Sequence, residues 1–144
     1  MILIRYTSSC SKEGYTFFIR KEKQMKDLSK CKYIAIDFDD TIVRSEFPNI
    51  VGLQPHAKEV INSLYKSGKQ ILIWTCREGE ELEQAKRFLA ECGINYHYIN
   101  ENHPDLMKAY GNNSRKLGAD VYIDDKGHTT EQVNWREIYK QFNR

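Results

Sequence analysis

Three aspartates follow a short apolar run, and their spacing suits metal-dependent chemistry. Residues 33–36 (YIAI) have the composition of a buried strand, and Asp37, Asp39 and Asp40 come directly after them. Carboxylates this close repel one another unless a cation or protons neutralise them. Because Asp37 and Asp39 are two residues apart, an extended backbone directs both side chains to one side, where one phosphate could meet both. We therefore interpret this segment as a divalent-metal site at the end of a central strand.

Two further apolar runs also end in polar side chains. Residues 70–75 (QILIWT) predict a strand that ends at Thr75, and residues 121–123 (VYI) predict a strand that runs into Asp124 and Asp125. Phosphoryl transfer requires a metal ion, hydroxyl donors and a cationic side chain around an anionic group. One carboxylate can act as the nucleophile, and a second can protonate the leaving group and then activate water. The pattern therefore favours phosphoryl transfer.

The elements that must position these side chains alternate along the chain. Strands are predicted at residues 33–36, 70–75, 96–99 and 121–123; helices are predicted from Pro55 to Gly68, over residues 80–91, near residues 106–110 and from residue 130 onward. Such alternation implies right-handed crossovers and a parallel sheet covered on both faces. Ligands bind at the carboxyl ends of the strands in such a sheet, so Asp37, Thr75 and Asp124 are expected to meet there.

The first segment lies outside this pattern. Residues 2–7 (ILIRYT) and 15–20 (YTFFIR) predict a β-hairpin, and the charged residues 21–30 predict a helical turn or linker. We therefore divide the chain into an N-terminal hairpin and linker at residues 1–31 and an α/β domain at residues 32–144.

Composition excludes several classes of protein. The chain has 144 residues, 40% of them hydrophobic, and a net charge of +2, as in an ordinary soluble globular protein. No apolar run approaches the roughly 20 residues that span a bilayer, and Arg5 interrupts the opening apolar stretch, so we expect a cytoplasmic protein. The cysteines form no CxxC pair and are expected to be reduced. The basic segment at residues 20–32 fits nucleic acid only weakly.

The motifs and their order resemble those of the haloacid dehalogenase (HAD) superfamily. DFDDTIV (residues 37–43) resembles its DxDx[TV] motif, QILIWT its second motif, and DVYIDD (residues 120–125) its fourth motif, an apolar strand that ends in paired acids. Three motifs in order make a specific signal, which extends from about residue 32 into the closing helix. ILIWTCREGE and SRKLGADVYIDD resemble a group of small bacterial HAD-like phosphatases. The resemblance implies a Rossmann-like three-layer sandwich with a central parallel sheet.

The resemblance also implies roles for individual residues. Asp37 would be the nucleophile and a metal ligand, and Asp39 the general acid and base, with its backbone carbonyl contacting Mg²⁺. Thr75 would hydrogen-bond the transferring phosphoryl group, and Asp125 would ligate the metal directly, with Asp124 as its partner or a ligand through water. The lysine of the third motif would be Lys116, with Arg115 and Lys108 as alternatives. The expected substrate-binding residues are Thr41, Arg77 and Arg115.

Several alternatives remain open at this point. Residues 41–55 have room for a flap only, so no cap domain is expected. A capless site must admit a large substrate such as a macromolecular phosphate, or borrow cover from another subunit of a homo-oligomer that acts on a small phosphate ester. Asp40 stands where the family often has Gly, and we expect it to cap the following turn. Each acidic pair alone would also suit a turn or helix cap. The alternative to a Mg²⁺-dependent phosphatase is a regulatory module that binds metal or phosphate without turnover, either receiver-like or a degenerate HAD protein.

Overall fold

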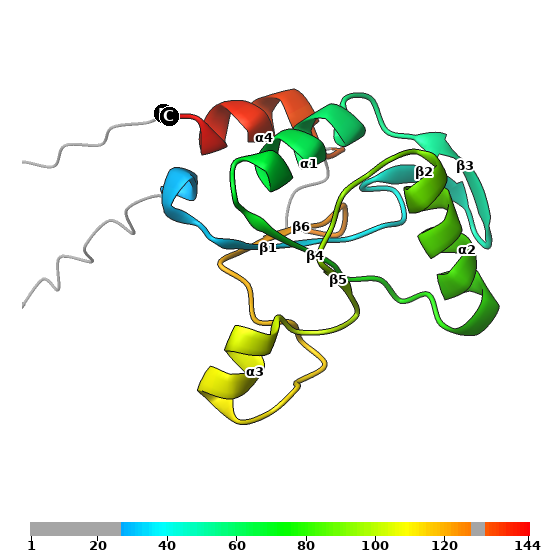
Figure 1. The fold of residues 1–144 in the computed structure, drawn as a ribbon. Coiled ribbons are helices and arrows are strands. Elements are labelled where there is room, and N and C mark those ends of the chain that lie inside the picture. Colours follow the sequence, from blue (N-terminus) through cyan, green and yellow to red (C-terminus); the bar gives the residue numbers. More distant parts are fainter. Residues whose placement is uncertain (1–26, 128–131) are drawn as a thin grey trace, which may run out of the picture.

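The computed structural model describes residues 27–127 and 132–144 (Figure 1). The described elements, in chain order, are η1 (Leu28–Lys30), β1 (Tyr33–Ile36), β2 (Val43–Glu46), β3 (Asn49–Leu53), α1 (Ala57–Lys66), β4 (Gln70–Ile73), α2 (Gly79–Glu91), β5 (Tyr98–Ile99), α3 (Pro104–Tyr110), β6 (Val121–Ile123) and α4 (Trp135–Phe142). The predicted N-terminal hairpin lies outside the described residues. The division of the chain at residue 31 therefore stays a prediction.

Four strands form the central sheet, in the order β5-β4-β1-β6. Every pairing within it is parallel, and Ile36 of β1 lies level with Ile73 of β4 and Ile123 of β6. Short continuous apolar runs are typical of strands buried in such a sheet. The structure confirms the α/β fold class with a central parallel sheet, and the arrangement is consistent with a HAD-like Rossmann fold.

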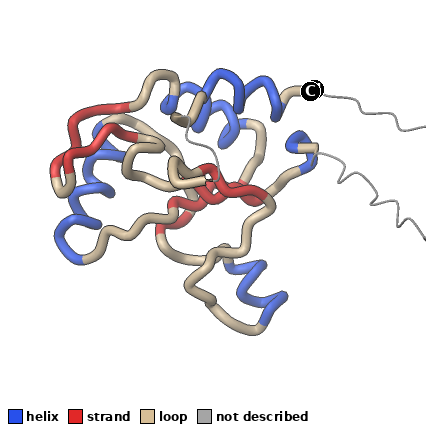
Figure 2. Tube along the Cα trace, turned by 180° about the vertical axis from the view of Figure 1, so that it is seen from behind, coloured by secondary structure: helices blue, strands red, loops and turns tan. Residues whose placement is uncertain are grey.

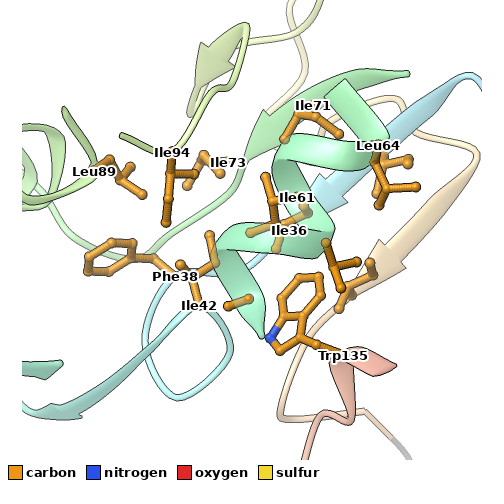
Figure 3. Packing of buried hydrophobic residues seen from close by; sticks show 14 of the residues in the cluster. Ile36, Phe38, Ile42, Ile61, Leu64, Ile71, Ile73, Leu89, Ile94 and Trp135 are labelled. Atoms are coloured by element: carbon orange, nitrogen blue, oxygen red, sulfur yellow. The ribbon is translucent and has the colours of Figure 1, made fainter. Parts of the chain in front are cut away.

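One face of the sheet carries most of the hydrophobic core (Figure 3). Ile36 and Ile71 project from neighbouring strands toward Ile61 and Leu64 of α1, a helix whose apolar residues recur at the spacing of one helical face (Figure 3). Trp135 of α4 is buried in the same cluster. Burying one such large side chain contributes roughly 1.5–3 kcal/mol, so this face anchors the sheet firmly.

The opposite face of the sheet is covered more thinly. Figures 1 and 2 show α1 and α4 on one side of the sheet and α3 on the other. No residue of α3 is itself buried. Ala35 and Leu72 point to this face and are buried, but they lie outside the main core cluster. The side of the sheet that carries α3 therefore has less apolar packing than the side that carries α1.

The connection between β1 and α1, where the sequence leaves room for a flap only, is a two-stranded hairpin. β2 and β3 pair antiparallel, with Val43 opposite Leu53 and Glu46 opposite Asn49. Val43 is buried whereas most of the ribbon is partly or fully exposed, so the sequence lacks the regular alternation that identifies a half-buried strand. The structure describes all of residues 37–56, and this two-stranded flap occupies the position at which a cap domain could be inserted. Among the described residues, no helix is long and apolar enough to cross a membrane.

Candidate active site

Three carboxylates converge at the carboxyl ends of β1 and β6. Asp37, Asp124 and Asp125 each offer an oxygen, and these oxygens lie within 4.8 Å of one another. The parallel pairing produces this arrangement, because β6 lies beside β1 and the Asp37 amide donates to the Ile123 carbonyl at 2.9 Å. The structure thus brings together three of the residues that the sequence places in a metal site.

Thr41 links the two sides of this cluster. Its buried Oγ1 donates to Asp37 Oδ2 at 3.0 Å and accepts from the Asp125 amide at 2.9 Å. Its carbonyl accepts from Trp135 Nε1 at 2.9 Å, which ties the loop to the core. A hydroxyl has one proton, and here Asp37 receives it. Thr41 therefore orients the carboxylates, and its expected contact with substrate stays a prediction.

The electrostatics of the cluster favour a bound cation. Burial raises the pKa of Asp37 to about 7, and the negative charges of Asp124 and Asp125 act in the same direction, while the hydrogen bond from Thr41 opposes them. Asp125 Oδ1 is buried and has no hydrogen-bond partner among the described residues. Carboxylate oxygens are the protein ligands that Mg²⁺ prefers. The cluster fits a divalent cation because an ion there would neutralise the repulsion and give Asp125 Oδ1 a partner.

Asp39 belongs to a separate ion pair with Arg77. Arg77 Nε lies 2.9 Å from Asp39 Oδ2, and Nη2 lies 2.7 Å from Oδ1, which makes the pair bidentate. The Arg77 side chain is fully buried, whereas that of Asp39 is 24% exposed. Arg77 Nη1 also donates to the Pro48 carbonyl at 2.9 Å, and the guanidinium lies 5.2 Å from the ring of Phe47. Arg77 thus holds Asp39 and the flap in place, a positioning role that the sequence did not predict.

Thr75 follows β4, next to β1 in the sheet, and is mostly buried. Its amide donates to Asn100 Oδ1 at 2.9 Å, and its Oγ1 accepts from the Arg77 amide at 3.1 Å. Since Oγ1 acts as an acceptor in this contact, the hydroxyl proton can be given to another group. The Asn100 contact was missed because a single Asn after a short strand carries no distinctive pattern.

The expected third-motif lysine contacts a tyrosine ring of β6. The Lys116 ammonium lies 5.2 Å from the centre of the Tyr122 ring, and among the described residues neither Lys116, Arg115 nor Lys108 forms an ion pair with the cluster. The cation that does is Lys126, whose Nζ lies 3.4 Å from Asp125 Oδ2 and whose pKa is raised chiefly by that carboxylate. The assignment of the third-motif role to Lys116 stays a prediction. Lys126 directly follows Asp124 and Asp125 in the sequence, and this adjacency could have indicated that its ammonium group lies near their carboxylates.

Asp40 lies outside the cluster, as expected for a turn residue. Its φ of 57° is in the left-handed region, which Asp tolerates better than most residues. Its Oδ1 accepts from the Ser45 amide at 3.1 Å, and its carbonyl accepts from Gln54 Nε2 at 3.3 Å. Asp40 therefore stabilises the turn into the flap, and the carboxylates that could bind a metal are those of Asp37, Asp124 and Asp125.

The structure is similar to that of a conserved protein from Bacteroides thetaiotaomicron. The TM-score is 0.67 and the sequence identity 32%, over 77% of this chain and 88% of that one. The two proteins belong to one family. A weaker match, with a TM-score of 0.40 and 18% identity over 67% of this chain and 60% of that one, is the cobalt-bound form of the deoxy-D-mannose-octulosonate 8-phosphate phosphatase (YrbI) from Haemophilus influenzae. No family model and no curated protein matches the sequence. Membership in the family of the Bacteroides protein supports the fold, and the chemistry has to be argued from the site.

Proposed function

We propose that this protein is a Mg²⁺-dependent phosphatase that hydrolyses a phosphate monoester through an aspartyl-phosphate on Asp37. The observation that carries the proposal is the convergence of Asp37, Asp124 and Asp125 at the carboxyl ends of two adjacent parallel strands. The buried Asp125 Oδ1, which lacks a hydrogen-bond partner among the described residues, marks where a cation would be held.

The three clustered carboxylates would hold the metal ion. When bound, Mg²⁺ supplies positive charge that neutralises the carboxylates and the phosphoryl oxygens. The ligand set consists of hard oxygen donors, and the chain places no described His or Cys in this cluster. These features favour Mg²⁺ over a softer metal.

The remaining groups can perform two displacements. The Asp37 carboxylate forms a bond to phosphorus while the ester oxygen leaves, and Asp39 gives that oxygen a proton. Asp39 then takes a proton from water, whose oxygen attacks phosphorus and releases inorganic phosphate from Asp37. The contact with Arg77 fixes the orientation of Asp39. Asp39 would enter the first step with a proton taken from solvent, become the carboxylate that the second step needs, and regain its proton from the attacking water. The Thr75 hydroxyl would donate to a phosphoryl oxygen.

Hydrolysis of a generic aryl phosphate with and without Mg²⁺ tests the proposal. The wild type should be active only with the metal, and Asp37→Asn should be inactive. Asp40→Asn is the matched control, because Asp40 lies outside the cluster and should leave Mg²⁺-dependent turnover in place. Equal inertness of wild type and Asp37→Asn across a broad panel of phosphate esters would overturn it. A long-lived phosphoprotein after acetyl phosphate treatment, without turnover, would favour the regulatory module instead.

A further inference from the structure

A cavity of about 450 Å³ opens on the side of the sheet that carries α3. Three tyrosines from different elements line it: Tyr33 of β1, Tyr110 of α3 and Tyr122 of β6. Tyr110 is 69% exposed and Tyr122 is 38% exposed, so aromatic surface remains accessible there. We call this cavity the tyrosine pocket.

The wall of the tyrosine pocket is held by hydrogen bonds of a buried amide. Asn102 Oδ1 accepts from the Gly118 amide at 2.6 Å, and Nδ2 donates to the Ser114 carbonyl at 2.9 Å. A Cβ at Gly118 would lie 3.2 Å from Leu106 Cδ1 and 3.8 Å from the Tyr110 ring. A side chain at this position would therefore crowd α3 and narrow the cavity. Gly118 therefore keeps the pocket open, and the hydrogen bonds of the buried Asn102 side chain hold its wall in place.

The tyrosine pocket and the acidic cluster share one face of the sheet. Tyr122 lies two residues before Asp124, and Tyr33 lies four residues before Asp37, so both pairs share a face of their strands. At about 3.3 Å per residue, these separations are roughly 7 Å and 13 Å along the strands. The Trp74 ring lies 5.7 Å from the Tyr122 ring, at the end of the strand next to β1. Tyr33, Ala119 and Asp120 lie at the amino ends of β1 and β6, so the pocket extends away from the carboxylates, and a ligand that bridged the two would run along Tyr122.

Two ammonium groups and one carboxylate lie at the tyrosine pocket; the carboxylate is that of Asp120, whose Oδ2 accepts from the Lys32 and Tyr33 amides. The Lys116 ammonium lies 5.2 Å from the centre of the Tyr122 ring, and the Lys32 ammonium lies 4.9 Å from that of Tyr33. Ring faces stack on other planar rings, and ammonium groups attract phosphate. This combination is what proteins use to bind nucleotides through their bases.

We propose that the tyrosine pocket binds the base of a nucleotide whose phosphate is presented to Asp37. The substrate class would then be nucleoside monophosphates, in which a sugar separates a planar, polar-edged ring from the phosphate. This inference rests on the proposed phosphatase function for its chemistry, but the binding of the base can be measured without turnover. The inference also gives the exposed tyrosines on the α3 side a function, which is to contact the part of the substrate that a cap domain would otherwise bind.

The first measurement is the binding of adenosine and cytidine, which carry no phosphate, followed by NMR at the Gly118 and Ala119 amides. Wild type should show saturable shifts at these amides. Tyr110→Ala should weaken nucleoside binding about tenfold, as expected for the loss of one stacking ring. Tyr110 is mostly exposed, so this variant should fold, and Tyr139→Ala on α4 is the matched control, because it removes an exposed tyrosine from a different surface.

The second measurement compares kcat/KM for nucleoside monophosphates and for a sugar phosphate. We expect wild type to prefer the nucleotide, and Tyr110→Ala to lower that preference about tenfold while Tyr139→Ala retains it. An active enzyme that binds no nucleoside, or shows no preference, would overturn the nucleotide inference and leave the phosphatase proposal standing. Saturable nucleoside binding by a protein inert toward every phosphate ester would support the pocket and overturn the phosphatase proposal.

Discussion

Replacing Asp37 by Asn is expected to stabilise the metal-free protein at neutral pH while abolishing hydrolysis. Burial, together with the charges of Asp124 and Asp125, raises the pKa of Asp37 to about 7. Ionised Asp37 therefore opposes folding when no metal is bound. Asn has nearly the same shape, carries no charge and can still accept the hydrogen bond from Thr41. The same substitution removes the nucleophile.

The sign and size of the effect follow from linkage. The folded-state pKa of about 7 lies above the ordinary value of 3.8, so the native protein holds the Asp37 proton more tightly than the unfolded chain. The stabilisation that comes from protonated Asp37 is fully present below about pH 4 and is lost as the pH rises through 7. At about 1.4 kcal/mol per pKa unit the loss is at most about 4 kcal/mol. Asp37 is only half-buried, so solvent screening reduces our expectation to about 2 kcal/mol.

Urea unfolding in EDTA at pH 5 and pH 8 measures this difference. Relative to Asp37→Asn, the free energy of unfolding of the wild type should fall by about 1 kcal/mol between the two pH values, because part of the total loss of about 2 kcal/mol already occurs below pH 5. Mg²⁺ at pH 8 should restore the wild type and leave Asp37→Asn unchanged. Asp105→Asn, an exposed substitution on α3, should keep the wild-type profile. Parallel pH profiles for wild type and Asp37→Asn would refute the reasoning.

Three other substitutions separate the roles in the site. Arg77→Ala should destabilise the protein by about 3–5 kcal/mol in urea unfolding, because it breaks a buried ion pair, and a loss under 1 kcal/mol would contradict the positioning role. Thr41→Val should cost about 1–3 kcal/mol and lower kcat more than it raises KM, since it unpairs two partners at once; unchanged kcat would count against it. Asp125→Asn should weaken Mg²⁺ binding at least about tenfold by calorimetry, whereas Asp40→Asn should change it little. If Asp125→Asn and Asp40→Asn changed the affinity for Mg²⁺ equally, Asp125 would be excluded as a metal ligand.

The parallel sheet and the convergence of carboxylates could be predicted from the sequence. The bounds of β1 and β6 coincide with the predicted strands, because buried parallel strands carry continuous apolar runs. Parallel strands also end at one edge of the sheet, so Asp37 and Asp124 had to lie close once β1 and β6 were neighbours. Periodicity likewise identified α1, whose buried residues fall on one helical face.

The side-chain pairings within the site could not be predicted in the same way. Arg77 meets Asp39 across 38 positions in sequence, and that contact depends on how the chain turns after β1 and after β4. No local pattern encodes such a turn. The flap itself was expected, but its two strands were not, because a short ribbon with one buried residue in β2 leaves almost no hydrophobic period to detect. Lys126 was overlooked because motif order directs attention to a lysine that precedes the acidic pair.

The alternation of β1 explains why the chemistry lies where it does. Ile34, Ile36 and Phe38 face the core under α1, whereas Tyr33 and Asp37 face the opposite side. Ionised carboxylates repel one another, so they stay close only where well-packed structure prevents the strands from separating. The tightly packed face provides that restraint, and the thinly covered face leaves room for substrate. Shortening the Ile36 side chain, for example by Ile36→Val, removes packing from the core without removing a group that contacts substrate. It should therefore lower the stability of the protein and weaken metal binding, because the carboxylates are held together less firmly.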